Sequence, residues 1–217
     1  MKIFRRFLFA LLPVLIFTVA PPSFAATVPD DGVLNFSVMR KGDKIGSHRM
    51  VFTHSNDKTS VNITTRIKVK VLFVTAYHFE HNSRETWQGD QMTSLWSKTN
   101  DDGRKHQMNV TKNAPDLAID ADGKFSSAKA NIIPASLWNK AVVEQNILLN
   151  TLDGSQMKVT TTNLGFETIT VKGQHVKAEH FKVQGDLERE LWYTPLGLLV
   201  KFQLTGSDGS NVQYILE

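Results

Sequence analysis

The sequence predicts an all-β protein: an antiparallel meander that forms a strongly curved sheet, half-barrel or barrel, with one short helix. Apolar and polar residues alternate along residues 61–71, as they do on a strand with one buried face. Asp-Gly pairs, which tolerate the positive φ angles of type I′ turns, lie at 102–103, 122–123, 153–154 and 208–209. Turn signals recur about every ten residues, a spacing typical of barrels and sandwiches.

A leader is expected at residues 1–25. Lys2, Arg5 and Arg6 precede an apolar run over residues 7–20, and a small-x-small site follows at 23–25. This order is typical of a secretory signal peptide. Because the apolar run is shorter than the roughly 20 residues that a bilayer-spanning helix needs, we expect no membrane span. The sequence therefore predicts cleavage near Ala25 and a periplasmic or secreted mature protein.

The remaining residues, 26–217, are expected to form a single antiparallel β domain, since no Pro/Gly/Ser-rich linker divides them. Cleavage would remove three of the 25 basic residues and none of the 21 acidic ones, which leaves a net charge of +1. We therefore expect no nucleic-acid partner. The sequence has no cysteine, which excludes disulfides and thiol catalysis. Phosphate-binding, dinucleotide-binding and zinc-protease motifs are also absent, so no cofactor is predicted.

The first strands are predicted from turn signals. Residues 33–39 and 45–53 flank a tight turn and form a hairpin. The segment Val61–His81 follows and would span roughly 70 Å if fully extended, far more than a usual strand of about 5 to 6 residues. It must bend, bulge or be broken, and the alternation lapses at the apolar run 71–74.

A short helix is predicted near residues 137–145. Leu137, Trp138, Ala141 and Val142 fall at helical spacing, and Ser136 is placed to cap the start. We expect this helix to cover an open edge or one end of the core; the alternative is a movable lid.

Further strands are predicted before and after this helix, and they bring the expected total to about ten to twelve. Turn residues such as Pro195 separate them. The further strands are predicted at 84–87, 92–99, 166–171, 176–184, 187–193, 198–205 and 212–216.

His78, Glu80 and His81 form the densest group of metal-ligand residue types. On an extended strand His78 and Glu80 share a face while His81 points to the opposite one. The three cannot ligate one ion unless the backbone bulges, so no metal site is predicted.

Carboxylates beside aromatic residues suggest a second kind of site. Glu85 shares a strand face with Trp87, and Asp186, Glu188 and Glu190 form a row on another predicted strand. Side chains two residues apart on a strand are about 6 to 7 Å apart, which is compatible with the acid and base of a glycosidase. Neighbouring basic residues also offer these acids ion-pair partners, and no catalytic residue is assigned.

Three functions remain open. The first is a binding or carrier protein whose curved sheet encloses a lipid or another apolar or amphiphilic ligand. The alternatives are a carbohydrate-active hydrolase that uses the carboxylates and a structural envelope-interaction protein. The carrier ranks first because curved half-barrels form pockets and no activated nucleophile is visible. Its expected ligand-binding residues are Ile67, Val69, Val71, Phe73 and Tyr77.

Four motifs carry a family resemblance: Gly42-x-x-x-Gly46-Ser47-His48, residues 68–73, Glu85-Thr86-Trp87, and above all residues 191–201 (LWYTPLGLLVK). In these the chain resembles a family of uncharacterised bacterial secreted β domains, described as a domain of unknown function. The resemblance covers essentially the whole mature chain and implies export and a strongly curved antiparallel sheet. The implied fold is more distantly similar to the lipoprotein-carrier half-barrels, although this chain lacks their amphipathic N-terminal helix. The family supplies no catalytic residues.

Overall fold

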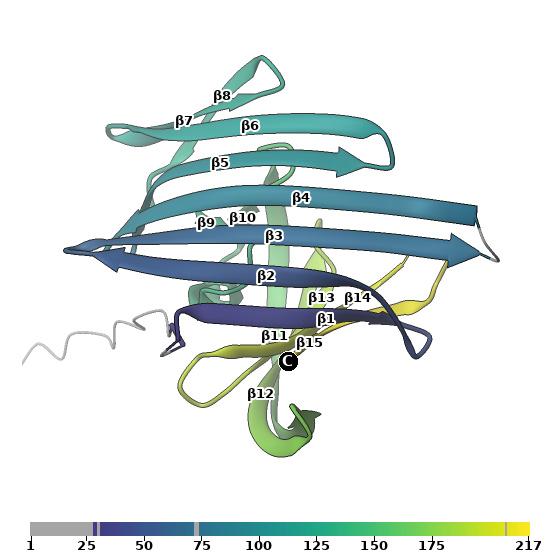
Figure 1. Ribbon diagram of the computed structural model, residues 1–217. Helices are drawn as coiled ribbons and strands as arrows, with labels where there is room; N and C mark the ends of the chain where they lie inside the picture. Colours follow the sequence, from purple (N-terminus) through teal and green to yellow (C-terminus); the bar gives the residue numbers. More distant parts are fainter. Residues whose placement is uncertain (1–27, 30, 72–73, 207) are drawn as a thin grey trace, which may run out of the picture.

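The computed structural model describes residues 28–217 except 30, 72–73 and 207. In this part of the chain fifteen strands form one sheet, and the one helical element is the 3-10 helix η1 (Lys140–Glu144) (Figure 1). The all-β prediction is confirmed, with more strands than expected. The strands are β1 (Val33–Arg40), β2 (Asp43–Ser55), β3 (Lys58–Val71), β4 (Val74–Gln88), β5 (Gln91–Asp101), β6 (Arg104–Asn113), β7 (Asp116–Ala121), β8 (Lys124–Lys129), β9 (Ile133–Pro134), β10 (Ile147–Leu149), β11 (Gln156–Val171), β12 (Gln174–Gly185), β13 (Arg189–Tyr193), β14 (Leu199–Thr205) and β15 (Asn211–Leu216).

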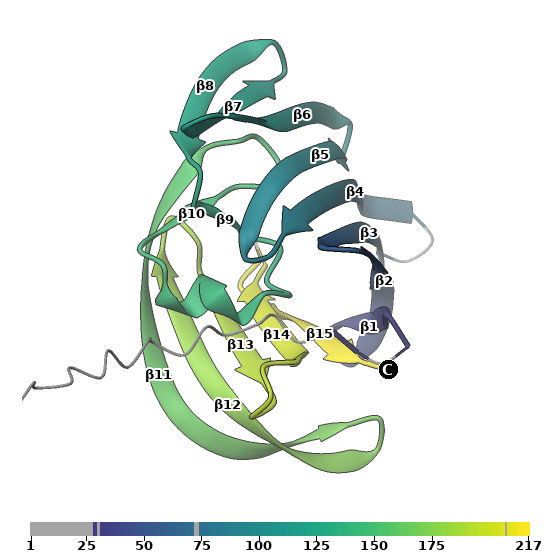
Figure 2. The same ribbon diagram turned by 90° about the vertical axis from the view of Figure 1, so that its left-hand side faces the viewer.

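The strand order is β8-β7-β6-β5-β4-β3-β2-β1-β15-β14-β13-β12-β11-β10-β9. All neighbours pair antiparallel except β9 and β10, which run parallel. The sheet therefore consists of two stretches of sequential strands, β1–β8 and β9–β14, joined by the last strand, β15. Figure 2 shows that the sheet curves around on itself.

The ends of the curved sheet, β8 and β9, do not pair with each other in the described residues. Contacts from the region of β11 cross the opening instead. The Gln156 side-chain amide donates to the Ser127 carbonyl on β8 at 3.1 Å. Gly154 lies so close to β7 that an added Cβ would be 2.8 Å from Ile119 Cγ2. The sheet is thus strongly curved but not closed by a strand ladder.

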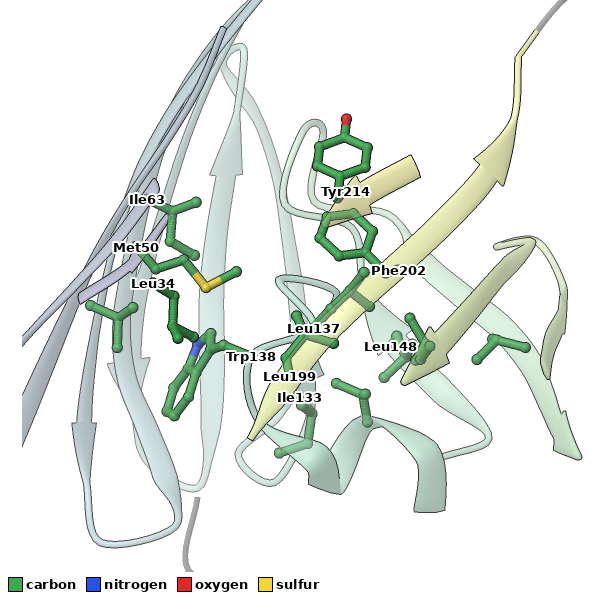
Figure 3. Packing of buried hydrophobic residues seen from close by; sticks show 14 of the residues in the cluster. Leu34, Met50, Ile63, Ile133, Leu137, Trp138, Leu148, Leu199, Phe202 and Tyr214 are labelled. Atoms are coloured by element: carbon green, nitrogen blue, oxygen red, sulfur yellow. The ribbon is translucent and has the colours of Figure 1, made fainter. Parts of the chain in front are cut away.

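The core lies on the inner face of the sheet. The predicted alternation is seen on β15, where Val212, Tyr214 and Leu216 are buried and the residues between them are more exposed. In Figure 3, Met50 and Ile63 of the first stretch lie across from Tyr214 of β15. Side chains alternate between the two faces of a strand, so strands from both stretches of the sheet point every second residue into the core.

The segment Val61–His81 is not one strand, because the chain reverses within it. β3 and β4 form an antiparallel hairpin, with Val71 paired to Val74. The break falls at the apolar run 71–74, where the alternation lapses, and a register shift lies at Val69/Lys70. The expectation of a broken strand is confirmed.

The helix predicted at 137–145 is shorter, and its cap is a different residue. Asn139 caps η1 by accepting the Ala141 N–H at 3.0 Å, so the assignment of the cap to Ser136 was wrong. Leu137 adopts a φ of 68°, a left-handed conformation that is incompatible with an α-helix starting there. Among the described residues no helix has the length and apolar character needed to cross a membrane.

The Asp-Gly pairs make two kinds of turn. At Asp102-Gly103 and Asp122-Gly123 both residues have positive φ, as a type I′ hairpin turn requires. In the pairs at 153–154 and 208–209 only the glycine does. The type I′ prediction is therefore correct for the hairpins β5–β6 and β7–β8 and wrong for the other two turns.

Candidate functional site

A cavity of about 320 Å³ lies between the inner faces of β2–β4 and β13–β15. Ligand pockets in proteins commonly have volumes of about 300 to 1,000 Å³. Apolar side chains from both stretches of the sheet form much of its wall, and residues 135–137 and 150–152 complete it. The apolar lining residues of the sheet include Ile63, Phe79, Met157, Phe202 and Leu204, and Leu187 lies just before β13.

A row of polar side chains crosses the inner face of β2–β5. Its members, His48, Thr65, His81 and Thr99, are successive cross-strand partners, and all are buried. His48 Nδ1 lies 2.7 Å from Thr65 Oγ1, and His81 Nδ1 lies 2.8 Å from Thr99 Oγ1. We call these four residues the polar row. All but Thr99 line the cavity.

Aromatic rings surround His48, the first member of this row. Its ring centroid lies 5.7 Å from that of Phe36 and 5.6 Å from those of Phe202 and Tyr214. Burial lowers the pKa of His48 to about 3, with a smaller contribution from His81. Burial also lowers the pKa of His81 to about 4. Both imidazoles are therefore neutral at neutral pH.

Several buried polar atoms near the cavity have no hydrogen-bond partner among the described residues. They include His48 Nε2 and the hydroxyl oxygens of Ser83 and Ser97. Ser83 and Ser97 are cross-strand partners on β4 and β5. An unpaired buried polar group costs about 1 to 3 kcal/mol. His48 and Ser83 are among the residues that line the cavity, but His48 Nε2 and Ser83 Oγ themselves are covered by protein.

Glu85 lies deeper, on β4, with no exposed surface. Its Oε2 accepts hydrogen bonds from the indole N–H groups of Trp87, at 2.8 Å, and Trp138, at 2.9 Å. Burial raises the pKa of Glu85, and these hydrogen bonds oppose the shift only in part. Glu85 therefore ties the segment around η1 to β4.

Three charged residues line the cavity on the β13 side: Asp186, Glu188 and Arg189. The Asp186 carboxylate accepts the Lys158 backbone N–H at 2.9 Å. The Arg189 guanidinium donates to the Glu188 carbonyl at 2.7 Å, and burial lowers the pKa of Arg189. Both acids border the cavity, and among the described residues no hydrogen bond joins their side chains.

Glu190, the third member of the predicted carboxylate row, is not part of this cavity. Its Oε2 lies 3.0 Å from His180 Nε2 and accepts from the Gln203 side-chain amide at 3.1 Å. Glu188 and Glu190 both line a second pocket, of about 350 Å³, which also includes Asn211. The structure thus divides the predicted row between two pockets.

The predicted ligand-binding residues lie beside the cavity lining. Ile67, Val69 and Tyr77 are buried or half-buried, and they belong to the same hairpin, β3–β4, as the lining. None of the three lines the cavity, which is bounded by residues earlier on β3 and later on β4. Phe73 and the side chain of Val71 fall outside the described residues. A ligand-binding role for these five residues stays a prediction.

The group at 78–81 follows strand periodicity. His78 Nε2 lies 3.4 Å from Glu80 Oε1, and both side chains are partly exposed. His81 points inward and is buried in the polar row. In the described ranges no cluster of three or more His, Cys, Asp or Glu side chains could hold a metal ion.

Sequence reasoning missed the polar row. His48 and Thr65 occupy inward positions on strands whose apolar and polar residues alternate. A polar residue on the otherwise apolar face of a strand was the sequence signal that could have revealed them. Their assembly depends on the registers of three strand pairs, and each register is fixed only by the folded sheet.

Comparison with solved structures finds a related fold. A crystal structure described as a beta-barrel-like protein of domain of unknown function DUF1849, from Brucella abortus, matches with a TM-score of 0.59 and 8% identity. The match covers 85% of this chain and 94% of that one, and at this identity it concerns the fold alone. Residues 36–217 match the model of a family described as domain of unknown function DUF6134. Curated protein sequences show no match.

Proposed function

Since the chain belongs to the DUF6134 family, a domain of unknown function, we propose a function from the geometry of its own cavity: the protein binds a small amphiphilic ligand, such as a lipid, inside the curved sheet. One observation carries this proposal. The cavity combines apolar walls with polar lining residues, among them Asn150, Asp186 and Arg189. An amphiphile would cover the apolar walls and place its polar group beside the polar residues.

The hydrolase alternative has weaker support. Glu85 is enclosed by protein and bonded to two indoles, whereas a general acid or base must reach its substrate. Glu190 is already bonded to His180 and Gln203. A purely structural protein would ordinarily fill its interior, because packed cores hold few voids larger than a water molecule. The geometry therefore favours binding over either alternative.

Export to the periplasm is a second part of the proposal. It is supported by the basic, apolar and small-x-small order of residues 1–25. Mass spectrometry of the protein recovered from a periplasmic extract should give the mass of a chain that begins at Ala26. Recovery of the full-length chain from the cytoplasm alone would refute export.

Ligand binding can be tested with a matched pair of variants. Leu187 lines the cavity, so Leu187→Trp should partly fill it. Leu196 is 80% exposed in the turn between β13 and β14, so Leu196→Trp serves as the control. Native mass spectrometry of protein purified without detergent should show a bound amphiphile in the wild type and in Leu196→Trp. Its occupancy should fall in Leu187→Trp.

The circular-dichroism spectra of the three proteins should agree, which separates loss of ligand from loss of fold. If the wild type carries no amphiphile and takes up none from added ten-carbon amphiphiles, the binding proposal is wrong.

A further inference from the structure

Taking the proposed function as its basis, we infer that the head group of the amphiphile is an oxyanion, a carboxylate or a phosphate, and that Arg189 and Tyr214 bind it. Both residues line the cavity. Arg189 is the first residue of β13 and Tyr214 lies on β15, with β14 between the two strands in the sheet.

The side chain of Arg189 belongs to the inner face of the sheet. Leu191, two residues later on β13, is fully buried and pairs directly with Phe202, which in turn pairs with Tyr214. Phe202 and Tyr214 line the cavity, and their rings stack with centroids 4.1 Å apart. Directly paired residues share a face, as do residues two apart on one strand. Arg189 therefore points to the same side as this row.

Both side chains have donors that are free among the described residues. The Arg189 guanidinium makes one hydrogen bond, to the Glu188 carbonyl at 2.7 Å. The Tyr214 hydroxyl makes none in this part of the chain, although the residue is only 6% exposed. The described polar atoms that lack a partner and are fully covered by protein belong to other residues, so these donors keep accessible surface. In Figure 3 the Tyr214 hydroxyl points away from the labelled apolar side chains.

Tyr214 can act as a donor to an anion at neutral pH. Burial raises the pKa of its hydroxyl to about 12, and Arg189 opposes this shift. The hydroxyl therefore stays protonated, and the electrostatic interaction between the two residues shows that they act on the same region of the cavity.

Arg189 forms no ion pair with a carboxylate among the described residues. Glu190, the next residue on β13, pairs with His180 instead, and Glu188 acts on Arg189 only from a longer distance. Burial lowers the pKa of Arg189, because the half-buried site disfavours its charge. A bound oxyanion would supply the missing counter-charge and accept the free guanidinium N–H groups.

The acids on the same side of the cavity do not exclude an anion. Asp186 and Glu188 are exposed, so water and salt screen their charges. Asp186 also accepts the Lys158 N–H at 2.9 Å. An ammonium head group would face the unpaired guanidinium, and an uncharged one would leave it without a counter-charge. An oxyanion is therefore the head group that suits Arg189 and Tyr214 together.

The test compares four ligands that share a ten-carbon chain: sodium decanoate, decyl phosphate, 1-decanol and decylamine. Isothermal titration at neutral pH, below the micelle-forming concentration of each ligand, should give at least about tenfold tighter binding of decanoate or decyl phosphate than of the other two. The first two ligands distinguish a carboxylate from a phosphate. Decanol or decylamine binding as tightly as the better anion would overturn the inference and leave the binding function intact.

Variants then assign the contact. Arg189→Gln should weaken binding of the preferred anion by about tenfold or more and leave decanol binding unchanged, because the contacts to the alkyl chain remain. Tyr214→Phe keeps the ring that stacks on Phe202 and should weaken anion binding by up to about tenfold. Arg49→Gln, at an exposed position on β2, makes the same change in net charge as Arg189→Gln and should have no effect.

The conservative variant Arg189→Lys keeps the positive charge and should restore part of the preference for the anion. Unchanged preference for the anion in Arg189→Gln would overturn the assignment. If that variant does not fold, unchanged anion affinity in Tyr214→Phe would overturn it. No binding of any of the four ligands by the wild type would refute the proposed function as well.

Discussion

Polar side chains at inward positions set the chemistry of this protein at the scale of single residues. Their presence on dry strand faces is visible in the sequence, as for Glu85 and His81. Their partners are not visible, because Glu85 meets Trp138 across 53 positions of the chain. The same limit explains why Asn139, and not Ser136, caps η1: the left-handed Leu137 decides where the helix can start.

Replacing Glu85 by Gln should make stability less dependent on pH. Burial raises the folded-state pKa of Glu85 above the ordinary value of 4.5. The folded protein thus binds the proton more tightly, and its stability falls as pH rises from 4.5 to the folded-state pKa. Glu85→Gln keeps an acceptor for both indoles and cannot ionise. Urea unfolding across this range should show a smaller loss for Glu85→Gln than for the wild type.

At neutral pH the Gln variant should be at least as stable as the wild type. Glu85→Ala, which leaves two indole donors unpaired, should lose about 1 to 3 kcal/mol or more. A Gln variant as unstable as the Ala variant would show that an ionised carboxylate is required there.

His48 and His81 should oppose Glu85 in their pH dependence. Their folded-state pKa values, about 3 and about 4, lie below the ordinary 6.5. Their contribution to stability is present above pH 6.5 and is lost as pH falls through the folded-state values. Each contributes a slope of about 1.4 kcal/mol per pH unit between its two pKa values. Measuring in the Glu85→Gln background removes the opposing carboxyl.

Nuclear magnetic resonance gives the direct measurement. The ring signals of His48 and His81 should not titrate from about pH 8 to about pH 5. His81→Gln should flatten the stability slope, whereas His175→Gln, at an exposed hairpin position, should leave it intact. A signal from His48 that titrates near 6.5 would contradict its burial as a neutral ring.

Among the elements, the hairpins were the easiest to predict from the sequence, and the segment around η1 was the hardest. The lapse of alternation at 71–74 marks the β3–β4 turn, and the lengths of the two strands, 14 and 15 residues, explain why the segment resembled one continuous strand. The segment around η1 has helical spacing but packs as an irregular plug, with Leu137, Trp138 and Val142 buried.

Trp138 should behave as part of the core. Its ring centroid lies 5.3 Å from that of Phe52 and 5.5 Å from that of Trp87, and it is bonded to Glu85. Trp138→Ala should therefore cost about 3 to 5 kcal/mol in urea unfolding. Val143→Ala, at a half-buried position of the same segment, should cost far less. A loss below about 1 kcal/mol for Trp138→Ala would indicate a detachable lid instead.

The β2–β3 pair should depend on Gly46. An added Cβ at this position would lie 2.1 Å from the Arg66 carbonyl oxygen, so the two strands would have to separate. Gly46→Ala should destabilise the fold by about 1 to 3 kcal/mol in urea unfolding. The neighbouring exposed change Ser47→Ala should stay within about 0.5 kcal/mol. Equal stabilities of the two variants would show that the strands adapt without strain.

For the whole molecule, local patterning was enough for the fold class but not for the strand order. Pairs such as β1–β2 and β14–β15 are neighbours in sequence, and turn chemistry reveals them. The pairing of β1 with β15 joins the two ends of the described chain, and no local signal selects it over other strand pairs. The cavity depends on that pairing, because His48 and Tyr214 come from strands on either side of β1.

Removing residues 211–217 should therefore unfold the protein and not merely fray one edge. β15 pairs with β1 on one side and with β14 on the other, so its loss divides the sheet between β1–β8 and β9–β14. It also removes Tyr214 from the cavity wall and exposes the inner faces of both stretches. We expect the truncated chain to lose the cooperative urea transition.

Deleting Glu217 alone removes a hydrogen bond to the Asn35 carbonyl and an exposed ion pair to Lys44, and should cost no more than about 1 to 2 kcal/mol. A cooperative transition in the longer truncation would mean that one stretch folds without the other, and that β15 assembles the cavity from two independent units.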